Sequence, residues 1–253
     1  MKFYSLASGS SGNSFLIDNG KQTILIDAGI TYEKIKEKLA SLNYDINEID
    51  YVLITHEHGD HIRGIKYFPT NKLYSGVKVP GVKNIFVKNE EIRLGDYLIL
   101  SYPLSHDVAC CGYRITHKDE SLVYLTDTGY VNYKVKPYLS NATYYVFESN
   151  HDVNMLMDSN RPFFLKSRIL SDNGHLSNED ASELICEAIG VNTKEIYLAH
   201  VSKDCNTKEL AYDCLIKTMN NKNLSIDKLK IDVLDREEIL KGGNLYDKDC
   251  LSV

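Results

Sequence analysis

A run of six residues, His56-Glu57-His58-Gly59-Asp60-His61, constrains this chain more than any other feature. The run follows directly on an apolar segment at 51–55 that has the length and composition of a buried strand. Neutral imidazole and carboxylate are ligands that Zn²⁺, Mn²⁺ and Fe²⁺ accept. On an extended turn His56 and His58 face one ion, while Asp60 and His61 fall on another side and are free to bind a second. A solvated polar turn explains this density of histidines poorly, so we predict a metal site.

Further candidate ligands follow strand-like segments in the same way. Each stands where an apolar segment ends: Asp27, His106, Asp127 and His200. Alone, each is more typical of a turn former or a helix cap than of a ligand. Together with the histidine run they form a set, because α/β proteins gather their sites at strand ends.

The apolar pattern predicts a sequence of short strands and a few longer helices. Strand-length runs recur at 3–6, 14–18, 23–27, 51–55, 97–101, 111–116, 121–126, 143–147, 195–199 and 230–234. Helical patterns lie at 31–42, 177–189 and 207–219, with a capping box predicted at Ser177 and Asp180. Hairpin-like strand pairs precede the first helix and recur in the middle of the chain. This order favours an α/β fold of sheets covered by helices over a purely parallel, doubly wound sheet.

No low-complexity linker or charge block divides the chain. We therefore expect a single domain over residues 1–234. The last stretch, 235–253, contains Gly242-Gly243 and many charges and is predicted to be a peripheral tail.

Composition excludes several classes of protein. With 43% hydrophobic and 25% charged residues, and with 15 Gly and 5 Pro in 253 positions, the chain is neither disordered, collagenous nor a coiled coil. Its net charge of −6 provides no general basic field for nucleic acid or an anionic membrane. Any polyanionic substrate therefore requires a local basic patch or a metal.

The cellular location of the protein and the state of its cysteines are predicted from features that the sequence lacks. It has neither an apolar run of about 18 residues nor a signal peptide, so we expect a cytoplasmic protein with no membrane span. The cysteines form no Cys-x-x-Cys pair and are too sparse for a disulfide scaffold. We expect free thiols, mainly buried packing residues, at Cys110, Cys111, Cys186, Cys205, Cys214 and Cys250.

In order and spacing, the candidate ligands resemble those of the metallo-β-lactamase-fold hydrolases. Residues 56–61 match the His-x-His-x-Asp-His signature of that family, and its remaining motifs are matched in order by Asp27, His106, Asp127 and His200. The resemblance implies an αββα sandwich with a dinuclear site at one edge of the paired sheets. It also implies that Asp27 supports the histidine loop.

The resemblance narrows to the YycJ/WalJ group through the segments 6–14, 148–152 and 174–178. Members of that group are described as phosphodiesterases that act on DNA with 5′-to-3′ exonuclease activity, which implies the same function here. The segment at 174–178 is also similar to the Gly-His-Ser loop of the tRNA 3′-processing ribonucleases. No insertion between Asp127 and His200 has the size of the extra domain of the β-CASP nucleases, so that branch is disfavoured.

Two other functions of the same fold fit the residues less well than nuclease activity does. Flavin-linked di-iron members have glutamate where His58 stands and need a flavin domain, and the antibiotic hydrolases are exported. Hydrolysis of a small cyclic phosphate or a thioester, RNA processing, and a metal-binding regulatory role without catalysis stay open as alternatives. We expect nucleic acid as the partner, DNA in preference to RNA, and leave the oligomeric state open.

The resemblance also implies a division of the ligands between two divalent ions, whether Zn, Mn or Fe. One ion is assigned to His56, His58 and His106. The other is assigned to Asp60, His61 and His200, with Asp127 as the bridge. Two ions roughly 3.5–4 Å apart bind a phosphodiester oxygen and generate a hydroxide nucleophile. We assign Asp60 and His175 to the catalytic residues.

Substrate contacts are predicted at two places. The loop 7–14 offers N–H and hydroxyl donors for a phosphate from Ser10, Ser11 and Asn13. Lys166 and Arg168 are the preferred basic contacts within a wider set near the motifs, which also includes Arg63, Lys134, Lys136 and Lys203.

His175 falls outside the metal ligand set and lies in the segment 171–177, just ahead of a predicted helix. Histidine ordinarily titrates near neutral pH, so it is suited to protonate the alkoxide that leaves in phosphodiester cleavage. We predict that His175 is the general acid. A supporting hydrogen bond to a metal ligand or to the helix start is the alternative role.

Overall fold

Two seven-stranded sheets face each other in a computed structural model, which describes residues 1–86 and 90–244. The first sheet has the order β14 (Leu240–Gly243), β1 (Lys2–Ala7), β2 (Ser14–Asp18), β3 (Thr23–Ile26), β4 (Tyr51–Ile54), β5 (Leu73–Ser75), β6 (Asn84–Ile85). The second has the order β13 (Lys230–Val233), β12 (Glu195–Ala199), β11 (Tyr144–Glu148), β10 (Glu120–Leu125), β9 (Cys110–His117), β8 (Tyr97–Leu104), β7 (Glu91–Leu94). Both sheets mix parallel and antiparallel pairs, as the strand order in the sequence predicted.

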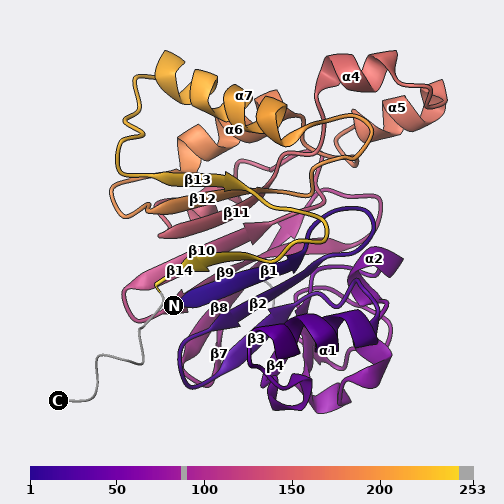
Figure 1. The fold of residues 1–253 in the computed structure, drawn as a ribbon, viewed down its shortest axis with the longest axis vertical. Coiled ribbons are helices and arrows are strands. Elements are labelled where there is room, and N and C mark those ends of the chain that lie inside the picture. Colours follow the sequence, from indigo (N-terminus) through magenta and orange to yellow (C-terminus); the bar gives the residue numbers. More distant parts are fainter. Residues whose placement is uncertain (87–89, 245–253) are drawn as a thin grey trace.

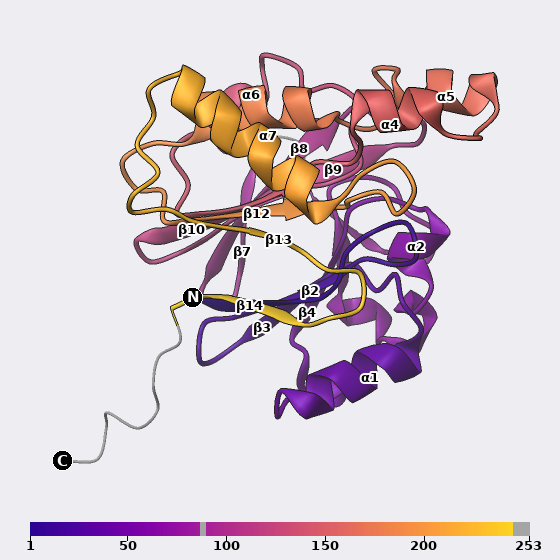
Figure 2. The same ribbon diagram turned by 45° about the horizontal axis from the view of Figure 1, so that its top comes forward.

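Helices cover the outer faces of the sheets, which gives the four layers visible in Figures 1 and 2. α1 (Tyr32–Ser41) packs under the first sheet, and α6 (Asn178–Ala188) and α7 (Lys208–Asn221) pack over the second. Shorter helices complete the chain: α2 (Gly59–Ile62), η1 (Ile46–Glu48), η2 (Ile65–Tyr67), η3 (Thr70–Lys72), α3 (Lys136–Leu139), α4 (Val153–Asp158), α5 (Phe163–Ile169). The predicted αββα sandwich is confirmed.

Central strands such as β2, β3 and β11 are buried on both faces, because their side chains alternate between two apolar layers. In β11, Tyr144 points into the cluster between the sheets, whereas Tyr145 joins the cluster under α6 and α7. The ring of Phe3 packs between the sheets, where its centroid lies 5.2 Å from that of Tyr144 and 5.3 Å from that of Tyr197. These apolar layers hold the strand ends, and hence the residues that follow them, in fixed positions.

The predicted helices begin at the capping residues that the sequence indicates. The Ser177 hydroxyl accepts a hydrogen bond from the Asp180 N–H at 3.0 Å, which is the N-cap half of the predicted capping box. The Asp180 carboxylate accepts from the Ser177 hydroxyl at 2.8 Å, whereas in a full capping box it accepts from the backbone N–H of the cap residue. Thr31 and Thr207 cap the other two long helices. The short strands β5, β6, β7 and β14 were not predicted, because their two to four residues carry too little of a period-two pattern.

The predicted boundary at residue 234 is wrong for the part of the tail that the structure describes. Leu240–Gly243 forms β14 and pairs antiparallel with β1, covering an edge that would otherwise be open. A side chain at Gly242 would collide with the ring of Phe3, and Gly243 has a φ of +75°. The two glycines therefore allow the backbone of β14 to lie close against β1. Residues 245–253 lie outside the described residues.

The cysteine prediction is confirmed where it can be tested. Cys110, Cys111, Cys186 and Cys205 are buried free thiols, and Cys214 is a half-buried one. Cys250 lies outside the described residues. Among the described residues, no helix combines the length and the apolar character needed to cross a membrane.

Candidate metal centre

All the predicted ligands gather at one edge of the two sheets, because each follows the end of a strand. Asp27 follows β3, Asp127 lies just past β10, and His200 follows β12. These three residues have φ values of 58°, 62° and 55°, in the left-handed region that costs a non-glycine residue free energy. Backbone strain shared by three residues of one cluster indicates a functional constraint rather than a packing need.

The first group of ligand atoms comes from His56, His58 and His106, as predicted. His58 Nδ1 lies 3.0 Å from His56 Nε2 and 3.3 Å from His106 Nε2. Three converging ring nitrogens cannot all be satisfied by one another's protons, whereas a cation accepts lone pairs from all three. Asp107, which was not predicted, lies beside this group with its Oδ1 3.2 Å from His58 Nε2.

The second group is centred on Asp127. Its Oδ2 lies 3.2 Å from His61 Nε2, and its Oδ1 lies 3.4 Å from His200 Nδ1. Asp60 is farther out, with its Oδ2 3.7 Å from His61 Nε2. Among the described residues, Asp127 Oδ2 and His200 Nε2 are buried without a hydrogen-bond partner. Orphaned buried polar atoms of these types fit a bound cation, so the residues present suit the two predicted ions.

Asp27 orients His61, as the family resemblance implied. Its Oδ2 lies 2.7 Å from His61 Nδ1, and its Oδ1 accepts a hydrogen bond from the Thr55 N–H at 2.9 Å. This contact places the proton of the ring on Nδ1 and leaves Nε2 to face Asp127. Asp27 is completely buried and supports the histidine loop from beneath.

The charges of these residues depend on one another. Burial disfavours the charged His61 ring, but the carboxylates of Asp27 and Asp127 outweigh burial and raise the pKa of His61 well above its usual value. Burial likewise opposes ionisation of Asp127, yet His200 and His61 hold its pKa well below the usual range. Burial and the neighbouring His61 lower the pKa of His56. A bound cation would replace protons on these rings, so metal affinity should fall in acid.

Glu148 is a second candidate site residue, besides Asp107, that the sequence did not predict. It is the last residue of β11 and is fully buried, and its Oε1 lies 2.7 Å from His175 Nδ1 and 2.8 Å from His200 Nδ1. Burial raises the pKa of a carboxyl group, but His175 and His200 outweigh it and lower the pKa of Glu148 to about 2. Glu148 could have been found in the sequence by the pattern that indicated Asp27, which is a polar residue at the end of an apolar strand.

A cavity of about 430 Å³ opens onto the ligand cluster. His175 and Arg168 line it together with Ser10, His58, Gly59, Asp60, His106, Asp107, Asp127 and His200. The Arg168 guanidinium is held 2.5 Å from the Asp107 carboxylate. The cavity therefore presents a basic side chain and an imidazole beside both groups of metal ligands.

Three predicted substrate contacts, Ser11, Asn13 and Lys166, do not lie on this cavity. Asn13 is buried, and its amide exchanges hydrogen bonds with Gly9 and lies 3.0 Å from His61 Nε2, so it organises the loop instead of facing a substrate. The Lys166 ammonium turns to the Met157 carbonyl at 2.5 Å. Neither contact could be foreseen, because the loop's fold and the direction of α5 are tertiary features.

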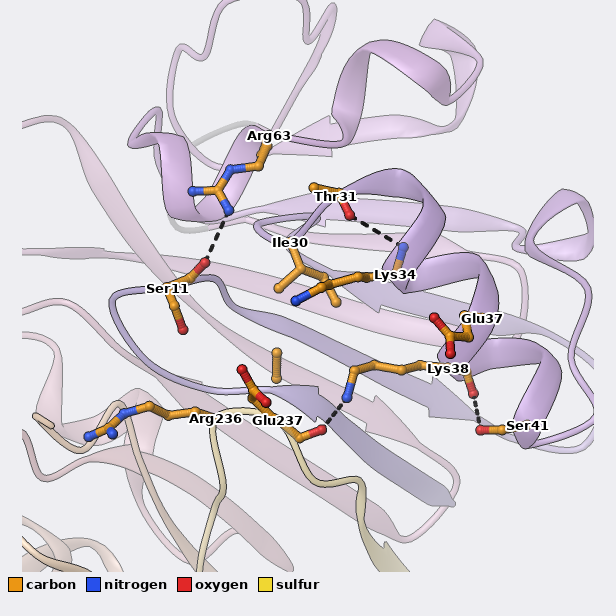
Figure 3. Close-up of a pocket in the computed structure, with 11 residues that line it drawn as sticks. Ser11, Ile30, Thr31, Lys34, Glu37, Lys38, Ser41, Arg63, Arg236 and Glu237 are labelled. Carbon is orange, nitrogen blue, oxygen red and sulfur yellow. Dashed lines mark hydrogen bonds between the residues drawn. The ribbon is translucent and has the colours of Figure 1, made fainter.

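Ser10 and Ser11 connect the metal cavity to two neighbouring cavities. One, of about 320 Å³, lies between α1 and the segment 236–237 and is drawn in Figure 3. There Arg63 and Lys34 both point toward Ser11, and Arg63 Nη1 donates to the Ser11 carbonyl at 3.2 Å. The second cavity, of about 790 Å³, includes Lys203 and Arg161.

The basic residues near the motifs are thus only partly brought together. Arg63 and Lys203 line cavities that adjoin the metal site, and Arg168 lines the metal cavity itself. Lys136 instead forms an exposed ion pair with Glu187. The predicted local positive surface therefore consists of fewer residues than expected.

His151 gives a prediction for stability against pH. It is buried, neither ring nitrogen has a hydrogen-bond partner among the described residues, and burial lowers its pKa from 6.5 to about 4. Between these pH values His151 is therefore protonated in the unfolded chain and neutral in the folded chain. The free energy of unfolding falls as the pH drops from 6.5 toward 4. Urea unfolding of His151→Leu protein should lose about 2 kcal/mol less than the wild type between pH 7.5 and 5. Equal losses would contradict this account.

Comparisons with known proteins agree with the geometry. Residues 7–109 match the model of the metallo-beta-lactamase superfamily. The exodeoxyribonuclease WalJ of Streptococcus pneumoniae is 41% identical over 243 residues, which cover 89% of this chain and 90% of that protein. The exodeoxyribonuclease YycJ of Bacillus anthracis is 36% identical over 242 residues, covering 89% and 92%.

Solved structures share the fold at lower identity. The metallo-beta-lactamase fold protein YhfI from Bacillus subtilis has a TM-score of 0.68 at 16% identity, covering 95% of this chain and 99% of that one. The short form of human tRNase Z has a TM-score of 0.65 at 13% identity, covering 95% and 98%. At these identities the likeness concerns the fold alone.

Proposed function

Because the chain belongs to the WalJ/YycJ family of exodeoxyribonucleases within the metallo-β-lactamase superfamily, we propose that it is a DNA exonuclease that digests from the 5′ end with two divalent ions. It is a metal-dependent hydrolase of phosphodiester bonds. The observation that carries the proposal is the position of Asp127, whose two oxygens face His61 on one side and His200 on the other. A hydrogen-bonded His175–Glu148 pair lies directly beside it.

In this proposal the chain's own residues divide the work as follows. His56, His58 and His106 would hold one ion and Asp60, His61 and His200 the other, with Asp127 available to both. Bound divalent ions, whether Zn, Mn or Fe, supply Lewis acidity for the phosphodiester and an activated water. Arg168, anchored by Asp107, neutralises a phosphate oxygen in the cavity.

His175 would then hold the proton for the leaving oxygen. Its Nδ1 is engaged by Glu148 at 2.7 Å, so Nε2 is the nitrogen left for a substrate. Glu148 fixes the orientation of the ring. Proton donation by a positioned imidazole eases the departure of an alkoxide, which is a poor leaving group.

The path of the DNA backbone is proposed to run over Ser10 and Ser11. Among the described residues, no carboxylate oxygen lies within 4 Å of the charged groups of Arg63 and Lys34, so both cations are available to phosphates. The net charge of −6 makes such local cations necessary for binding a polyanion.

Replacement of both cations tests this path. Lys34→Gln/Arg63→Gln protein should bind 5′-phosphorylated DNA about tenfold more weakly at low salt, with a slope of log affinity against log salt that is smaller by about 1–2. Fluorescence anisotropy over a salt series measures both quantities. Lys136→Gln is the control, because that lysine is already paired with Glu187. An unchanged slope would exclude these residues from the DNA path.

One substrate screen tests the function itself. The metal-loaded protein is offered double-stranded and single-stranded DNA labelled at either end, precursor tRNA, bis-p-nitrophenyl phosphate, a cyclic phosphate and a thioester. Mononucleotide release from the 5′ end of DNA is expected. Faster cleavage of precursor tRNA or of a small substrate would replace the proposal with one of those activities.

A further inference from the structure

Two phenylalanine side chains stand in solvent at the amino-terminal end of α5. Phe163 is 76% exposed and Phe164 is 74% exposed, more than any other aromatic side chain in the described part of the chain. In Figures 1 and 2, α4 and α5 project together from one edge of the molecule. An exposed pair of large apolar rings is unusual on a protein surface and typically marks a binding surface.

The fold of this projection does not depend on the two rings. α4 and α5 pack around a small cluster of their own, formed by Leu156, Ile169 and Cys205 with Leu165 against it. Asp152 caps α4 by accepting a hydrogen bond from the Met155 N–H at 2.8 Å. Phe163 and Phe164 belong to none of the buried clusters, so they are presented on a helix that is held in place by other residues.

The opposite end of α5 forms a wall of the metal cavity. Arg168 lines that cavity, and the Ile169 carbonyl accepts a hydrogen bond from the His175 N–H at 3.0 Å. A side chain at Gly174 would lie 2.1 Å from the same carbonyl, so the His175 loop is pressed against the helix end. From residue 163 to residue 168 the helix rises about 7.5 Å, which is about two base steps of a stacked strand.

The charge of the segment favours a nucleic acid over other partners. Residues 161–168, Arg-Pro-Phe-Phe-Leu-Lys-Ser-Arg, contain three basic residues and no acidic one. Arg161 is paired with Asp204 and Arg168 with Asp107, so a phosphate on this segment would share these two cations with the carboxylates. Aromatic rings interleaved with cations are the combination that binds unpaired strands, because the rings stack on bases while the cations contact phosphates. Because Arg168 also lines the metal cavity, a strand bound along this segment would extend to the metal ligands.

We propose, resting on the function proposed above, that Phe163 and Phe164 form a stacking platform for the bases of a DNA strand whose phosphodiester lies in the metal cavity. The platform holds one or two unpaired bases next to the bond that is cleaved. Because stacking is nearly independent of base identity, it positions the strand without selecting its sequence.

Steady-state kinetics of Phe163→Ala/Phe164→Ala protein test the platform. On a 5′-phosphorylated single-stranded oligonucleotide, kcat/KM should fall roughly tenfold for each base stack lost. On bis-p-nitrophenyl phosphate, which has no base to stack, kcat/KM should not change. On an oligonucleotide with abasic sites at its first four positions, wild type and variant should be equally slow, because the missing bases remove the same contact.

Control variants separate stacking from other effects. Phe163→Tyr/Phe164→Tyr should retain the wild-type rate, because tyrosine also stacks. Val191→Ala, at a side chain that is 97% exposed elsewhere on the surface, should change nothing. A loss of equal size on abasic DNA, a loss on bis-p-nitrophenyl phosphate, or full activity of the alanine variant on DNA would each overturn the platform.

Other occupants of this surface give different results. Sedimentation that shows a wild-type dimer and an alanine-variant monomer would identify the rings as a contact between two copies and overturn the proposal. If the wild type floats with phosphatidylglycerol vesicles and the alanine variant does not, the rings bind a lipid surface and the proposal is overturned. If the wild type cleaves no DNA, the proposed function fails and the platform with it. If it cleaves DNA and the alanine variant does so equally well, only the platform fails.

Discussion

Asp127→Asn protein is expected to bind fewer metal ions than the wild type and to lose at least about 10³-fold in kcat/KM on any phosphodiester. The carboxylate of Asp127 is the group that faces both His61 and His200, and one of its oxygens is buried without a hydrogen-bond partner among the described residues. Asparagine keeps the shape but removes the charge and one acceptor. The loss should be the same for DNA and for bis-p-nitrophenyl phosphate, since the ions act on the reacting phosphate itself.

Metal content by mass spectrometry and thermal unfolding with and without added metal complete this test. The wild type should gain stability when metal is added, because an ion that binds only the folded chain shifts the folding equilibrium. Asp127→Asn should gain less. Asp213→Asn, on the exposed side of α7, is the matched control. Wild-type metal content and activity in the Asp127→Asn protein would contradict the shared-ligand arrangement.

His175→Ala protein is expected to keep its metals and to lose roughly 10²–10⁴-fold in kcat on DNA. The imidazole lies close to Asp127 and His200, but its Nδ1 is engaged by Glu148 and it belongs to neither predicted set of ligands, so its removal should spare the ions. On a diester with a p-nitrophenolate leaving group the loss should be much smaller, because that group departs without a proton. Rates on the two substrates, measured on metal-loaded protein, separate these effects.

Glu148→Gln extends the same test to the residue that positions His175. We expect a loss of about 10–100-fold on DNA, again smaller on the p-nitrophenyl diester. The double variant with His175→Ala should be little worse than His175→Ala alone, because both substitutions disable one proton donor. Equal losses on both substrates, or loss of metal, would make His175 and Glu148 structural supports of the site.

The chemistry-bearing residues could be found in the sequence because each leaves a local signal. The histidine run and the polar residues at strand ends are short-range features, and so are the capping residues of the long helices. Asp27, His106, Asp127 and His200 each follow an apolar run closely. Since the ends of neighbouring strands lie side by side, residues that follow strand ends can be predicted to lie at one edge of the sheets.

What escaped prediction depends on which strands become neighbours. Glu148 meets His175 and His200 only because β11 lies beside β12 and the 171–177 loop folds back over them. The sequence predicts Asn13 as a substrate contact, but the loop 8–13 packs against the histidine loop and buries its amide. Lys166 and Arg168, two residues apart on α5, point to different surroundings because a helix turns by about 100° per residue.

The sequence by itself therefore determined the kind of chemistry and the order of its ligands, through residue types and spacings that no packing need explains. Only the tertiary structure decided which of those residues face a common cavity, that Glu148 contacts both His175 and His200, and that residues 240–243 join the first sheet as β14. The physical reason is that ligand preference is a property of single side chains. Contacts between distant segments instead depend on strand pairing and close packing, which no short stretch of sequence contains.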